Sequence, residues 1–290
     1  MPSLKEIRNR ITSVGSTMQI TSAMKMVSAA KLKRAQDAIT QMRPYAVKLQ
    51  DILGNLSTTL DLSENPYSEA REVKNVLIVG ITSNRGLCGG FNNNIIKRVN
   101  QLVNEDYKNA NPRVLCLGKK IKDAYKRSDA YYINETLEPV EDIFSGLNFD
   151  NTTIIANELM RLFTSKEFDK VVVVYNQFVN AATQLVKTEQ FLPIVPNVQE
   201  NAGSGDYIFE PSKEEIVTEL IPKSLKVQLF KGLLDSNASE HGARMTAMHK
   251  ATDNAKELQR SLKLSYNKAR QAAITNEILE IVGGAEALNG

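Results

Sequence analysis

Near the start of the chain, apolar side chains recur at alternating steps of three and four residues, the repeat of a coiled-coil seam. The seam is clear at Leu4, Ile7, Ile11, Val14 and Met18, and again at Leu32, Ala35, Ile39 and Met42. Between these stretches the same step reaches Thr21, Lys25 and Ser28, so the apolar stripe fades and then returns. Ser3 and Glu6 have the spacing of a capping box. We predict one long helix from about Ser3 to about Leu60.

The middle of the chain alternates short apolar runs with helix-like stretches. NVLIVGIT and KVVVVY are continuous apolar runs of strand length. The pattern predicts strands at 75–82, 113–117, 130–133 and 170–175, an edge strand at 183–188, and helices at 91–106, 119–127 and 151–164. Strands that alternate with helices are typical of a mostly parallel α/β sheet.

The last part of the chain is helical again. Pro222 favours a helix that begins near Lys223. One apolar stripe follows Met245, Met248, Thr252 and Ala255 and continues at Leu262, Tyr266, Ala269 and Ala273. A second, slightly rotated stripe follows Ile274, Ile278, Ile281 and Ala285.

Two long striped helices at opposite ends of one chain bury their stripes most simply by pairing with each other. We therefore predict a mixed α+β and α/β fold: an antiparallel coiled coil of the N- and C-terminal helices with an inserted Rossmann-like α/β domain. The predicted divisions are 1–60 for the first coiled-coil helix, 75–198 for the α/β domain, and 207–290 for the C-terminal region, which is mainly a long helix.

Composition excludes several classes of function. The chain has 290 residues, a formal net charge of only +3, two cysteines without CxxC spacing, and two histidines. These features argue against a dedicated nucleic-acid binder, a metal site and a disulfide framework. The sequence shows no signal peptide and no apolar run of membrane-spanning length. We expect a soluble protein without a cofactor that touches a membrane only through partners.

The stretch TSNRGLCGGFN at 82–92 directly follows an apolar strand. A glycine-rich loop between a strand and a helix can cradle phosphate. However, the loop lacks GK[ST] and the GxGxxG pattern, so we interpret it as a tight turn where backbone packs closely. Cys88 in this loop is interpreted as a structural thiol because the predicted domain contains no histidine to act as its base.

Several blocks of the sequence resemble the gamma subunits of F-type ATP synthases. ITNEILEIVGGAEAL at 274–288 is similar to the C-terminal signature of that family, with Glu277, Glu280, Gly284 and Ala285 in the matching places. ITSAMKMVSAAKLKRAQ, GITSNRGLCGGFN, ARMTAMHKATDNA and YNKARQAAITNE resemble its other blocks in the same order. The resemblance covers the whole chain.

The resemblance implies a rotor shaft that does no bond chemistry itself. Its coiled coil is inserted in a hexamer of three alpha and three beta subunits, and its foot sits on the epsilon subunit and the membrane ring of c subunits. Proton flow through that ring turns the shaft and drives ATP synthesis, and hydrolysis turns it in reverse. With no transit peptide in the sequence, we expect a peripheral location at the cytoplasmic face of a bacterial inner membrane.

The resemblance also implies contact residues, in three groups. Those expected at the lever loops of beta are Met24, Lys25 and Arg244. Those expected at the upper alpha–beta ring are Arg270, Gln271, Thr275 and Glu277. Those expected at the foot on the c ring are Tyr207 and Glu210. On this interpretation the faded part of the first seam is explained by a hypothesis: Lys25 and Ser28 suit a helix whose neighbours there are partly other proteins.

Two other functions stay open from the residues alone. A structural tether built on a coiled coil would self-associate without alpha and beta subunits. An enzyme with a nucleotide in the α/β domain would bind that nucleotide as an isolated chain. Neither alternative accounts for the block at 274–288. Met24 could likewise be a core residue or a partner-facing one.

Overall fold

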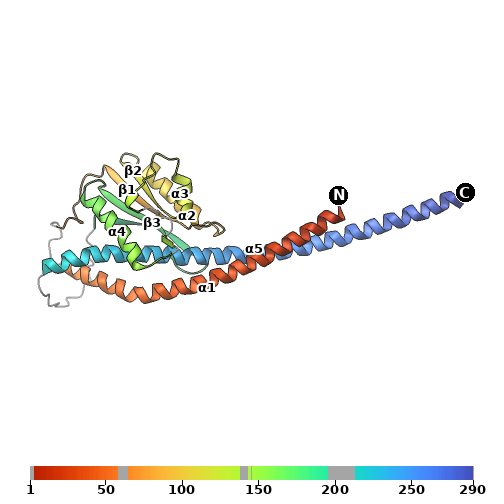
Figure 1. Ribbon diagram of the computed structural model, residues 1–290, viewed down its shortest axis with the longest axis horizontal. Helices are drawn as coiled ribbons and strands as arrows, with labels where there is room; N and C mark the ends of the chain where they lie inside the picture. Colours follow the sequence, from red (N-terminus) through yellow and green to blue (C-terminus); the bar gives the residue numbers. More distant parts are fainter. Residues whose placement is uncertain (1–2, 58–64, 138–142, 145, 195–212, 290) are drawn as a thin grey trace. The chain divides into compact units, whose positions relative to one another are not determined.

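The computed structural model describes residues 3–57, 65–137, 143–144, 146–194 and 213–289 (Figure 1). The chain divides into two compact units, one made of Met1–Val27 with Met245–Gly290 and the other of Ser28–Arg244. Both terminal helices, α1 (Leu4–Ser57) and α5 (Lys213–Asn289), run through both units. We describe the units separately, as unit 1 and unit 2 in that order.

Unit 2 contains a four-stranded sheet with the order β2-β1-β3-β4. The strands are β1 (Asn75–Ile81), β2 (Asn111–Leu117), β3 (Lys170–Phe178) and β4 (Gln184–Leu192). The first three are parallel, and β4 pairs antiparallel with β3 at the edge. The predicted mostly parallel sheet with an edge strand is confirmed, although β4 is longer than predicted.

Helices cover both faces of this sheet (Figure 1). Alternate strand residues point to opposite faces, so Val76 and Ile78 belong to a core with α2 (Phe91–Gln101) and α3 (Lys119–Tyr125). Leu77 and Val79 belong to the other core, together with α4 (Phe149–Thr164) and the first part of α5. The sheet is therefore the middle layer of three.

The first part of α5 is anchored to the sheet by a stripe at four-residue spacing. Ile221, Leu225, Leu229 and Leu233 are all buried in the core beside α4. The prediction that this helix begins near Lys223 is wrong, because α5 begins at Lys213 and Pro222 lies inside it. Proline removes one backbone hydrogen bond from a helix. Burial of Ile221 and Leu225, on either side of Pro222, offsets that loss.

The two terminal helices pair antiparallel, as predicted. In unit 1 the Arg8 guanidinium donates a 2.7 Å hydrogen bond to the Tyr266 hydroxyl, and the Thr252 hydroxyl lies 2.8 Å from that of Thr21. From the first contact to the second, the residue number rises on α1 and falls by a similar amount on α5, as it does in an antiparallel pair. In unit 2, Ala46 and Leu49 of α1 pack on Val227 of α5 in the same sense.

The polar break in the first seam is part of the helix pairing. Thr21 and Ser28 are buried, with 9% and 3% of their surface exposed, and Lys25 is partly buried. The hypothesis that the neighbours at Lys25 and Ser28 are partly other proteins is therefore wrong for Ser28, since the fold of this chain already covers its side chain. At Thr21 the seam is continued by a polar contact, since its hydroxyl lies 2.8 Å from that of Thr252 on α5.

Two other predicted elements differ from the structure. The strand predicted at 130–133 is wrong: Tyr131 forms one isolated bridge with Val114 and the chain then turns into the short 3₁₀ helix Glu135–Leu137. The helix predicted at 91–106 ends as the π-helix Leu102–Asp106.

Candidate functional site

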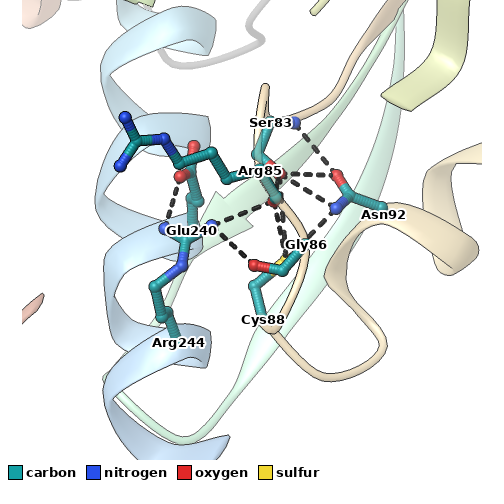
Figure 2. Close-up of polar contacts among 7 residues, drawn as sticks. All are labelled: Ser83, Arg85, Gly86, Cys88, Asn92, Glu240 and Arg244. Atoms are coloured by element: carbon teal, nitrogen blue, oxygen red, sulfur yellow. Dashed lines mark hydrogen bonds and ion pairs between the residues drawn. The ribbon is translucent and has the colours of Figure 1, made fainter. Parts of the chain in front are cut away.

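One candidate site is the loop after β1, where it meets α5 within unit 2 (Figure 2). The Arg244 guanidinium donates hydrogen bonds to the backbone carbonyls of Arg85 at 3.0 Å and Gly86 at 3.2 Å. It also forms an ion pair with Glu240, one helical turn earlier on α5. Both charged side chains are almost buried, at 9% and 11% exposed. Arg244 therefore ties the loop to the helix.

A second layer of polar contacts shapes the same loop from the side of α2. The Ser83 backbone N–H and hydroxyl both donate to the Asn92 side-chain oxygen at 3.0 Å. The Asn92 amide lies 3.2 Å from the Cys88 sulfur. Leu87 and Gly89 adopt positive φ angles of 62° and 59°, which give the turn its tight curvature. Three polar side chains thus hold the loop against α2.

This geometry favours the tight-turn interpretation of the loop over a phosphate cradle. A phosphate cradle presents backbone N–H groups to an anion, whereas this loop presents two carbonyl oxygens to a cation. Burial raises the pKa of the Cys88 thiol, although the Ser83 hydrogen bond and the Arg244 charge act in the opposite direction. The thiol is therefore held in its neutral, weakly nucleophilic form.

The second candidate site is the end of α5 in unit 1. The residues that the resemblance places at the upper alpha–beta ring are all exposed: Arg270, Gln271, Thr275 and Glu277. Large apolar side chains between and beyond them are exposed as well: Ile274, Ile278, Leu279, Ile281 and Val282. This part of α5 extends past the N-terminal end of α1 (Figure 1). The second apolar stripe therefore does not join the seam, contrary to the prediction.

The remaining predicted contact residues are on α1 in unit 1, in unit 2 or outside the described residues. Met24 and Lys25 are partly buried on α1, and their neighbour Met26 is 67% exposed. Arg244, which was predicted to act beside them, has its guanidinium engaged by Glu240 and the loop. Tyr207 and Glu210 lie outside the described residues.

Sequence reasoning missed the partners of Arg244. The four-residue spacing of Glu240 and Arg244 is a signal for an ion pair on one helix face. Nothing in the sequence pairs Arg244 with backbone carbonyls that lie about 160 positions away. Asn92 and Ser83 do not belong to a recognisable motif either. Their hydrogen bonds in the turn depend on tertiary geometry, which the sequence pattern does not show.

Among the residues that the structure describes, there is no cluster of three or more His, Cys, Asp or Glu side chains that could hold a metal. Within the same ranges, no helix combines the length and the apolar character needed to cross a membrane.

Comparison with known proteins gives a consistent assignment. A family model described as ATP synthase matches residues 3–288. The ATP synthase gamma chain of Christiangramia forsetii is 62% identical over 291 residues, and that of Flavobacterium johnsoniae is 63% identical over 292 residues. Each alignment covers 100% of both chains.

Solved structures agree with this assignment. A chain from the central stalk and c-ring structure of the Tetrahymena thermophila mitochondrial ATP synthase is 27% identical, with a TM-score of 0.57 over 80% of this chain and 99% of that one. A chain from the Euglena gracilis mitochondrial ATP synthase shares the fold at 20% identity, with a TM-score of 0.66 over 98% of this chain and 94% of that one. On the full-length match of the family model and of these relatives, the chain belongs to the ATP synthase gamma chain family.

Proposed function

We propose that this chain is the central rotor shaft of an F-type ATP synthase. In this role it has no catalytic chemistry of its own, and its rotation couples proton flow through a membrane ring to ATP synthesis or hydrolysis in an alpha–beta hexamer. Membership of the gamma chain family supports the proposal, as do the solved relatives named as central stalk and rotor.

The observation that carries the proposal is the apolar surface at the end of α5. Leu279 and Ile281 are 63% and 66% exposed, although burying one such side chain fully is worth roughly 1.5–3 kcal/mol. A helix that presents both charged and apolar groups around its circumference, and that no other described helix of the chain covers, is suited to being surrounded by other subunits.

Under this proposal the exposed polar residues of α5 contact the upper alpha–beta ring: Arg270, Gln271, Thr275 and Glu277. Met24 and Lys25 contact the lever loops of beta. Arg244 acts beside them by holding α5 against the loop, and it reaches beta directly only if it leaves Glu240.

The other proposed partners are the epsilon subunit and the c ring. Tyr207 and Glu210 are proposed to meet the c ring at the foot. The chain then binds as one copy to three alpha and three beta subunits, peripherally at the cytoplasmic face of a bacterial inner membrane. These details rest on the family resemblance.

Native mass spectrometry tests the proposal directly. The full chain is mixed with the alpha and beta subunits of the same organism, and ATPase activity is measured in parallel. We expect one copy of the chain per three alpha and three beta subunits, with strong ATPase activity only in the complete mixture. A chain that stays apart or pairs with itself would contradict the proposal and favour a tether.

A matched pair of substitutions tests the apolar surface. Ile278 on α5 and Ile154 on α4 are similarly exposed, at 55% and 57%. We expect Ile278→Asp to weaken assembly at least about tenfold, which corresponds to about 1.4 kcal/mol, and Ile154→Asp to assemble like the parent. Equal assembly of the two variants would remove this surface from the interface.

A further inference from the structure

Unit 2 contains a cavity of about 220 Å³ between α1, α5 and the end of β3. Its apolar wall includes Ile39 and Met42 from α1, Phe178 from β3 and Leu234 from α5. Ligand pockets commonly begin at about 300 Å³, so this cavity suits a small molecule or a narrow chain.

Three charged side chains line the same cavity: Arg43 from α1, and Lys231 and Asp235 from α5. Asp235 is only 6% exposed. Within the described part of the chain, no hydrogen bond and no ion pair of 4 Å or less holds its carboxyl group. The carboxyl group lines an open space rather than packed side chains.

The charge balance of the cavity selects an anion. Arg43 and Lys231 together carry two positive charges, and neither approaches Asp235 closely enough to form an ion pair. When Asp235 is neutral, the cavity offers two cations and one O–H donor beside an apolar wall. An anionic group could then accept from all three while its tail covers the apolar residues.

We propose that this cavity binds a small amphipathic organic anion, with Arg43 and Lys231 holding its charged group beside Asp235. Nothing in the rotor role requires this site. Its occupant bridges the two helices and the sheet, so binding stabilises unit 2.

The surroundings of Asp235 make binding dependent on pH. Burial raises the pKa of Asp235 to about 6, with Lys231 and Arg43 lowering it and Glu189 of β4 raising it. Tyr175 of β3 also interacts with this carboxyl group: burial first, and then Glu189 and the charge of Asp235, raise the pKa of Tyr175. Asp235 is mostly protonated at pH 5.5 and mostly ionised at pH 7.5. Binding restricted to the protonated form is therefore up to about twenty-five-fold tighter at the lower pH.

The test is a titration of the full chain with 1-octanesulfonate, whose charge is constant over this pH range, followed by calorimetry and by thermal unfolding. We expect saturable binding that is tighter at pH 5.5 than at pH 7.5. We also expect Asp235→Asn to remove that pH dependence. Octanol and octylammonium, which lack the negative charge, serve as ligand controls and should bind at least tenfold more weakly.

Three variants locate the site. Lys231→Gln should weaken binding at least tenfold, whereas Lys48→Gln removes a cation from α1 outside the cavity and should bind like the parent. Val47 lines the cavity and is 50% exposed. Val47→Trp should therefore fill the space and prevent binding while the chain stays folded, which thermal unfolding would verify.

Four outcomes with the isolated chain would overturn the proposal. They are equal binding by the Lys231 and Lys48 variants, octylammonium binding as tightly as octanesulfonate, affinity that does not change with pH, and unsaturable association of the surfactant kind. Loss of binding in the assembled complex alone would also overturn it, because the cavity would then be a seat for a partner subunit's side chain.

Discussion

At the scale of single residues, Arg244 joins parts of unit 2 that are far apart in the sequence. Arg244→Gln leaves the Glu240 carboxylate nearly buried without its cation and frees two loop carbonyls. Breaking one partner of a buried pair costs about 3–5 kcal/mol. We expect the free energy of unfolding to fall by about 3 kcal/mol, measured by urea denaturation of the full chain.

The control for this variant is an exposed pair. Lys126 and Asp123 are 52% and 57% exposed at their side chains, and exposed pairs contribute about 0–1 kcal/mol. Lys126→Gln should therefore unfold close to the parent midpoint. A loss of less than 1 kcal/mol for Arg244→Gln would mean that water replaces the tie and that the loop is held by Ser83 and Asn92 alone.

Asp235 gives a prediction about pH and stability. Because its pKa rises to about 6 in the folded chain, the folded state holds this proton more tightly than the unfolded state. The stabilisation is fully present below the unfolded pKa of about 4 and is lost as pH rises through 6. Asp235→Asn should therefore stabilise the chain increasingly, relative to the parent, from pH 4 to pH 6.5, with a plateau above.

His241 acts in the opposite direction and must be separated from Asp235. Burial, with the nearby charges of Arg244 and Lys31, lowers the pKa of His241 to about 4, so its contribution to stability increases as pH rises through 4 to 6.5. The difference between the Asp235→Asn variant and the parent cancels this contribution. A pH-independent difference in urea midpoints would show that Asp235 titrates normally.

At the scale of elements, two glycines of α5 have opposite roles. A Cβ on Gly242 would lie 3.2 Å from the backbone of Ala181, in the turn between β3 and β4, whereas Gly283 has nothing within 4 Å. We expect Gly242→Val to lower the melting temperature of the full chain, because the helix must move away from the sheet. Unchanged melting of Gly242→Val would show that the turn yields freely.

Gly283→Ala gains about 1 kcal/mol of helix propensity and should slow local amide hydrogen exchange about five-fold.

The elements also show how far the sequence predicts this fold. Apolar runs of strand length located the buried strands correctly, because strands covered on both faces read as continuous apolar runs. The run at 130–133 failed because Tyr131 pairs at one residue only. The start of α5 was predicted wrongly from Pro222. Burial of Ile221 and Leu225 in the tertiary fold outweighs the local helix-breaking preference of proline.

The candidate sites were harder to predict than the fold. Family resemblance selected the exposed residues of α5, and periodicity alone assigned Ile278 and Ile281 to the seam because it cannot show where α1 begins alongside α5. The resemblance assigned Arg244 to the lever loops of beta, and its contacts with the carbonyl groups of Arg85 and Gly86 could not be predicted because backbone acceptors leave no trace in a side-chain pattern. Asp235 and its cavity depend on three elements meeting, and no local signal carries that information.

At the scale of the whole molecule, the rotor proposal requires α1 and α5 to turn as one body. The hydroxyl groups of Thr21 and Thr252 lie 2.8 Å apart in unit 1, so we expect cysteines at both positions to bring their sulfur atoms together and to form a disulfide on oxidation. We expect the oxidised double variant to be more stable by about 2–4 kcal/mol. In the complex with alpha and beta subunits, its ATPase activity should equal that of the parent, because rotation as one body needs no sliding between the helices.

The single variants Thr21→Cys and Thr252→Cys, oxidised in the same way, control for loss of the threonine hydrogen bond and for the native thiols, Cys88 and Cys116, which are both buried. If oxidation lowered the activity of the double variant alone and reduction restored it, the two helices would have to separate or slide during each cycle. The seam would then be a moving part, and its small polar residues, Thr21 and Ser28, would serve to keep that contact weak rather than to pack it closely.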